Sequence, residues 1–174
     1  MDIKVNGLKS LNGWILTNKG EISPLLHRQL KRLSKNKLKG GFCMSNNVKK
    51  THTIEEIKEI FRILDNKTGE NFSNIDIKVD GRLKNILGSC IQICSVTEDG
   101  RILEIVGKKF RFSRQFLETP ITQETFVSII IHEYTHLYTN RQYLENCGHN
   151  EKFVNNCLKL GIKEKYARSS IDFR

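Results

Sequence analysis

Apolar residues recur every three or four positions along residues 53–69, which predicts an amphipathic helix. Thr53 precedes this pattern and Glu56 follows three residues later, an arrangement typical of a capping box at the start of a helix. The letters "NKTGE" at 66–70 predict its end. The helix should bury one face, made of Ile54, Ile57, Ile60, Phe61 and Leu64.

Strand-like patterns follow this helix. "IDIKV" at 75–79 alternates between apolar and polar residues. "GSCIQICSV" at 88–96 and "RILEIV" at 101–106 flank "TEDG", which predicts a hairpin. "KKFRFSRQFL" at 108–117 alternates and then shortens into a turn of helix. The order predicts an α+β fold with a small antiparallel or mixed sheet packed against helices.

Two more helices are predicted near the C-terminus. "TPITQETFVSIIIHEYTHLYT" has Pro120 and Thr122 at its start and apolar residues at helical spacing. "CGHNEKFVNNCLKLG" indicates a glycine-containing loop that enters a second helix, which ends at Gly161. Phe153, Cys157 and Leu160 should face inward from it.

Basic residues are concentrated in the first part of the chain. Residues 1–50 carry 11 basic and 2 acidic side chains, so they account for +9 of the net charge of +10. "SPLLHRQLKRLSK" at 23–35 predicts a short basic helix, and a linker follows it. We therefore divide the chain into a basic N-terminal segment, 1–50, and a domain at 51–174.

The densest part of this segment is a basic cluster, which we define as Arg28, Lys31, Arg32, Lys35, Lys37 and Lys39. Such a cluster is typical of a site that binds nucleic acid or another polyanion. No aromatic residue is interleaved to stack on bases, so a solvated basic arm that aids solubility is the competing interpretation.

The remaining composition constrains the environment of the protein. No apolar run approaches the roughly 20 residues that span a bilayer, and the N-terminus lacks the pattern of a signal peptide. The five cysteines are irregularly spaced and form no C-x-x-C pair. Both observations favour a cytoplasmic protein without a membrane partner. Cys90, Cys94 and Cys157 lie in apolar stretches and are predicted to be buried free thiols.

The motif "HEYTH" lies on the longest predicted helix. His132 and His136 are one turn apart, so both rings lie on the same helix face and can occupy two corners of a zinc tetrahedron. Glu133 then lies beside the open coordination position. From there it can accept a proton from an activated water and pass it to a leaving amine. This is the metalloprotease interpretation of H-E-x-x-H.

A third ligand is sought downstream. The compact form of the motif needs glycine at 139 and histidine at 142, but Thr139 and Gln142 stand there. Another class of site takes a glutamate from a later helix, for which Glu145, Glu151 and Glu164 are candidates. His149, at the mouth of the last predicted helix, is the better candidate. Cys147 is a spare one.

"HEYTH" followed by "GHNEKF" resembles the Spartan-related SprT-like zinc metalloprotease domain family over roughly residues 53 to 162. "RLKNILGSC", the hairpin and "KKFRFSRQFL" resemble the strand region of that family. The resemblance implies a zincin-like helix, zinc on His132, His136 and His149, and Glu133 as general base. It also implies hydrolysis of peptide bonds, often in DNA-bound proteins.

The leading hypothesis is therefore a zinc-dependent endopeptidase of SprT-like type that acts on protein or peptide substrates. DNA-associated proteins are the substrates that the family suggests, and the basic segment is the part that would contact DNA. The alternative is a non-proteolytic, antirestriction-like module that binds DNA, and a third hypothesis makes the zinc purely structural. Glu133 favours chemistry, because a structural zinc site has no need of a general base.

Overall fold

The computed structural model describes residues 49–168. A three-stranded sheet has the order β2-β4-β3, with β2 at Asp76–Asp80, β3 at Gly88–Val96 and β4 at Ile102–Ser113. β3 and β4 form an antiparallel hairpin, and β2 pairs with β4 in parallel. The sheet is therefore mixed and the fold is α+β, as the sequence predicts.

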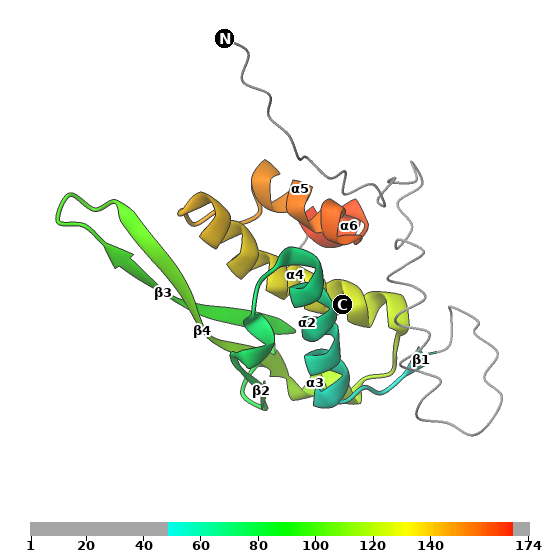
Figure 1. Ribbon diagram of the computed structural model, residues 1–174. Coiled ribbons are helices and arrows are strands. Elements are labelled where there is room, and N and C mark those ends of the chain that lie inside the picture. Colours follow the sequence, from blue (N-terminus) through cyan, green and yellow to red (C-terminus); the bar gives the residue numbers. More distant parts are fainter. Residues whose placement is uncertain (1–48, 169–174) are drawn as a thin grey trace, which may run out of the picture.

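The helices lie on one side of this sheet (Figure 1). α2 (Ile54–Thr68) and α4 (Gln123–Tyr143) pack on the strands. α5 (Glu151–Leu160) and α6 (Glu164–Arg168) pack on α4. α4 is buried on several sides and is the central helix of the described domain. Because α4 holds the H-E-x-x-H residues, the motif lies between the sheet and the last two helices.

Shorter elements complete the described part. A 3-10 turn, η1, spans Phe72–Asn74, and α3 spans Arg114–Glu118 directly after β4. β1 (Lys49–Lys50) pairs antiparallel with β5 (Ile121–Thr122), just before α4. This pairing holds the segment that precedes α2 next to the segment that precedes α4.

Local sequence signals explain how the main helices begin and end. α2 has a complete capping box: Glu56 N–H donates to Thr53 Oγ1 at 3.3 Å, and Thr53 N–H donates to Glu56 Oε2 at 2.9 Å. It ends at Gly69, which adopts a left-handed conformation with φ of 79°. The helix predicted at 53–69 is confirmed. Ile57, Phe61 and Leu64 on its apolar face are fully buried, and Ile54 at its start is partly buried.

Aromatic side chains fill the core between α2, the sheet and α4. Phe61 makes edge contacts with Phe110 and Tyr134, at ring-centroid distances of 4.7 and 5.4 Å. The hydroxyl of Tyr134 donates to Asp65 Oδ1 at 2.9 Å and lies 2.6 Å from Thr68 Oγ1, so this buried polar group has partners on α2. This packing fixes the side of α4 that faces away from the histidines.

One prediction about burial is wrong. Cys94 is exposed and Cys90 is only partly buried, whereas Cys157 is fully buried as predicted. The hairpin of β3 and β4 extends beyond the helices (Figure 1), so nothing in the described domain covers the far end of β3. Ile93 and Val96 lie on the same stretch and are also exposed.

The basic cluster and the predicted helix at 23–35 lie outside the described residues. Along residues 49–168, no helix has both the length and the apolar character needed to cross a bilayer. β1 places Lys49 and Lys50 with the folded domain, next to the boundary predicted near residue 50.

Candidate metal centre

The longest described helix presents the first two histidines. Thr122 caps α4, because its Oγ1 accepts a hydrogen bond from Thr125 N–H at 3.2 Å. His132 is buried, and His136 lies one turn later on the same face and is partly buried. His149 comes from the loop between α4 and α5 and is exposed.

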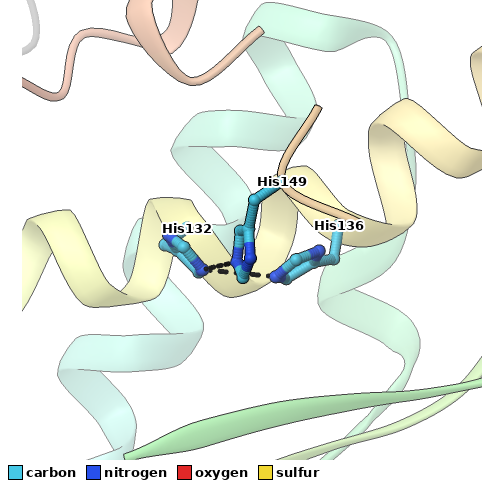
Figure 2. A group of neighbouring side chains, drawn as sticks. All are labelled: His132, His136 and His149. Atoms are coloured by element: carbon cyan, nitrogen blue, oxygen red, sulfur yellow. Dashed lines mark hydrogen bonds between the residues drawn. The ribbon is translucent and has the colours of Figure 1, made fainter. Parts of the chain in front are cut away.

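The three imidazoles point toward one another (Figure 2). Nε2 of His132 lies 3.2 Å from Nε2 of His136 and 3.0 Å from Nε2 of His149. Nitrogens bound to one zinc ion at 2.0–2.1 Å in a tetrahedron would stand about 3.3 Å apart. The spacing therefore fits three corners of such a site, and these side chains are a group that could hold a metal ion.

A hydrogen bond of Nδ1 fixes the tautomer of His132. Nδ1 of His132 lies 2.8 Å from the backbone carbonyl of Tyr166 in α6. A carbonyl only accepts, so Nδ1 donates, and in the neutral ring Nε2 then carries the lone pair that a metal needs. α6 thus orients the most buried of the three rings.

The side chain of Phe153 packs against the rings of all three histidines. It stacks on His136 with a centroid distance of 4.3 Å and meets His132 and His149 edge-on at 5.0 and 5.1 Å. It is fully buried at the start of α5. Phe153 therefore closes the site on one side and limits the rotation of the rings.

Burial keeps the two helical histidines neutral. Desolvation lowers the pKa of His132 to about 4, and a hydrogen bond to the Tyr166 carbonyl opposes this shift. Desolvation lowers the pKa of His136 to about 3, and repulsion from His132 and His149 adds to the effect. At neutral pH both rings are in the form that binds a cation.

Glu133 lies beside this group, on the side that faces the sheet. Burial raises the pKa of its carboxyl to about 8. Its side chain lies against Gly88 at the start of β3, where an added Cβ would be 2.6 Å from Glu133 Cγ. Only a glycine leaves room for this carboxyl, which is a reason for glycine within a strand.

A cleft of about 580 Å³ opens between β3, α4 and the loop that carries His149. All three histidines and Glu133 line it, together with the strand residues Gly88, Ser89, Cys90, Gln92 and Cys94. β3 is an edge strand of its sheet and pairs there with β4 alone. An extended chain in the cleft would therefore lie along a strand edge, next to the histidines and the carboxyl.

The alternative ligands are engaged elsewhere. Glu145 accepts from Lys152 Nζ at 2.6 Å and from the thiol of Cys147 at 3.5 Å. Glu151 and Glu164 both pair with Arg168. The geometry thus groups His149 with His132 and His136 and places the three glutamates in ion pairs.

Sequence reasoning missed two features of the site. Gly88 had a usable signal, because glycine weakens a strand and marks a close approach of another group. Tyr166 had none, since its contribution is a backbone carbonyl and any residue at that position would supply it. The basic cluster lies outside the described residues, so the structure does not relate it to the cleft.

The sequence model of the SprT-like family matches residues 57–171. The match begins in α2 and includes the sheet, the three histidines and Tyr166. No curated protein and no solved structure matches the chain.

Proposed function

Because the chain belongs to the SprT-like family, we propose that it is a zinc-dependent endopeptidase. One observation supports this most directly: three histidine Nε2 atoms converge beside the carboxyl of Glu133, in a cleft bounded by a strand edge. A purely structural zinc site is closed by four protein ligands, whereas a catalytic one has three and an open position. The group here has three histidines and faces a cleft.

Zinc fits this donor set. The nitrogens have tetrahedral spacing, His132 has its tautomer fixed by Tyr166, and burial keeps His132 and His136 neutral. A zinc ion on these residues would act as a Lewis acid toward a peptide carbonyl and lower the pKa of a water toward about 7.

Glu133 is proposed as the general base. Burial alone raises the pKa of its carboxyl to about 8, but a nearby divalent cation favours the carboxylate. The carboxylate can then accept a proton from the attacking water. The same oxygen afterwards donates that proton to the nitrogen of the leaving amine. The absence of a side chain at Gly88 leaves room for the carboxyl in the cleft during both transfers.

The substrate is proposed to be an extended peptide segment. The edge of β3 offers backbone donors and acceptors, and pairing along it would guide a peptide past Glu133. Apart from Glu133 and the histidines, the residues that line the cleft carry no ionisable side chain other than Cys90 and Cys94. Charge therefore gives little selection in the cleft, and DNA-associated proteins would be selected by contacts of the basic segment.

The test compares the wild-type chain with Glu133→Gln. Each is loaded with zinc and incubated with fluorescently labelled casein, with and without single-stranded DNA. The glutamine variant should keep its zinc and fold but lose 10²–10⁴-fold in cleavage rate, since an amide cannot accept the proton. Glu124→Gln is the matched control, because Glu124 lies on the same helix and pairs with Lys163 at 2.8 Å.

Equal cleavage by the Glu133→Gln variant would remove Glu133 from the role of general base. If the wild-type chain binds DNA but cleaves nothing under any condition, the non-proteolytic, antirestriction-like function is favoured instead. Cleavage that survives removal of zinc by a chelator would contradict the metal-dependent mechanism.

A further inference from the structure

Asn140 continues the helix face that carries the first two ligands. It follows His136 by four residues, as His136 follows His132, so the three side chains lie in one row along α4. Asn140 is buried and borders the cleft. The group that could hold a metal consists of three histidines and does not include Asn140. Its position next to them therefore indicates a different role.

The side-chain amide of Asn140 connects β3 to the loop between α4 and α5, residues 144–150, which carries His149 and is called the ligand loop below. Its Oδ1 accepts from Cys147 N–H at 2.9 Å, and its Nδ2 donates to Gln92 Oε1 at 3.0 Å. Cys147 offers a backbone N–H, which can only donate, so the orientation of the amide is determined. Both ends of a buried polar group are thereby satisfied across three elements: α4, β3 and the loop.

This contact acts close to His149. Cys147 lies two residues before His149, and its carbonyl accepts from Asn150 N–H at 3.0 Å. Asn150 in turn caps α5, with its Oδ1 accepting from Phe153 N–H at 3.2 Å. His149 therefore lies between Cys147, which is hydrogen-bonded to Asn140, and Asn150, which caps α5.

His149 needs such anchors, because it is exposed and burial does not hold it in place. The loop also turns through two left-handed residues, Leu144 with φ of 50° and Gly148 with φ of 51°. The side chain of Asn140 supplies a fixed point in it.

We propose that Asn140 is a positioning residue that holds the third metal ligand, His149, at the distance needed to complete the site. This inference rests on the proposed zinc site, though not on peptide cleavage. Asn140 acts through the loop and need not touch the metal or the substrate. Residues that orient metal ligands in this way usually change metal affinity by 10–100-fold when they are replaced.

The test measures zinc affinity by competition with a chromogenic chelator. Asn140→Ala should weaken zinc binding about 10–100-fold. Asn140→Asp should restore most of the affinity, because its oxygen still accepts from Cys147 N–H and the Gln92 amide can turn to donate to the other oxygen. The matched control is Asn156→Ala. Asn156 is also buried, and it donates to Thr139 and Gln142 of α4 at 3.1 and 2.9 Å, so both of these hydrogen bonds go to α4.

A double-mutant cycle separates positioning from general damage to the fold. If Asn140 acts through His149, then Asn140→Ala should cost no further affinity in a His149→Ala background. An equal loss in both backgrounds, or an equal loss in Asn156→Ala, would overturn the inference. If Asn140→Ala does not fold, Asn140→Leu carries the test in both backgrounds, because leucine keeps a similar side-chain volume and removes both hydrogen bonds; an equal loss with and without His149 overturns the inference.

The same titration distinguishes this inference from the proposed function. A wild-type chain without zinc affinity would overturn both. A chain that binds zinc and responds to Asn140→Ala as expected, yet cleaves no protein, would overturn the endopeptidase alone. Unchanged zinc affinity in Asn140→Ala would overturn the positioning role alone.

Discussion

Replacing Gly88 with alanine should displace the proposed general base without a direct effect on the three proposed metal ligands. The added Cβ would lie 2.6 Å from Glu133 Cγ, 2.9 Å from Cδ and 3.0 Å from Oε1. Carbon atoms in contact prefer about 3.5–4.0 Å, so roughly 1 Å of overlap must be relieved. The relief must come from Glu133 or from the start of β3, and either movement changes the position of the carboxyl in the cleft.

A displacement of this size in an active site can lower the rate about 10²-fold. We therefore expect Gly88→Ala to lose about that factor in kcat on labelled casein, with zinc affinity unchanged. A second readout does not depend on cleavage. In the metal-free protein, the carboxyl of Glu133 should titrate with a pKa near 8 in the wild type. Once it is pushed toward solvent, its pKa should move toward the ordinary value of 4.5, as followed by carboxyl-carbon NMR.

Gly81→Ala is the control, since the nearest atoms to an added Cβ there belong to the Arg114 side chain at 3.7 Å. It should change neither the rate nor the titration. Full activity in Gly88→Ala, together with an unshifted pKa of Glu133, would refute the steric argument. A loss of zinc in the variant would show instead that the strand moves and distorts the ligands.

Other outcomes follow from the same structure. His149→Ala should sharply lower zinc affinity in chelator competition, because three ligands become two; full retention would remove His149 from the site. Gly107→Ala should lower the melting temperature by an amount equivalent to about 1–3 kcal/mol, because its Cβ would overlap the side chains of Leu137 and Ile75. Partial burial would raise the pKa of Glu56, but hydrogen bonds with His52, Lys50 and the Thr53 backbone lower it to about 2. Between pH 4.5 and 2 the folded chain thus binds fewer protons at Glu56 than the unfolded chain. Stability should fall as the pH drops through this window, and less steeply in Glu56→Gln, as measured by urea unfolding. If the basic cluster contacts phosphates, a plot of the logarithm of the affinity for single-stranded DNA against the logarithm of the salt concentration should have a negative slope. Each phosphate contact should contribute about −0.7 to that slope. Neutralising the cluster should flatten this slope. An unchanged slope would show that the cluster does not contact phosphates and would favour its role as a solubilising arm.

The elements that the sequence predicted well depend on local signals. Thr53 and Glu56 are three residues apart, and their reciprocal hydrogen bonds make the start of α2 readable without the rest of the chain. Thr122 plays a similar part for α4. His132 and His136 are related by a single helical turn, so their common face follows once the helix is assigned.

The features that the sequence did not predict depend on contacts between distant residues. Gly88 meets Glu133, and the Tyr166 carbonyl meets His132, only after the sheet and α6 have packed on α4. The parallel pairing of β2 with β4 is of the same kind, since nothing in either strand states its partner. Cys94 was mispredicted because strand composition does not reveal how far the hairpin extends past the helices.

The three proposed ligands are close together in the sequence, and this affects how much a bound metal ion can stabilise the fold. His132 and His136 are separated by one helical turn, and His149 follows thirteen residues later, so a single short segment contains all three. If zinc is the ion that these histidines bind, it would also bind His132 and His136 in the denatured chain, before the strands have formed. An ion bound by both states stabilises the native one only by the difference in affinity. The melting temperature should thus rise with zinc by less than the native dissociation constant implies, and the shortfall measures zinc binding by the denatured ensemble.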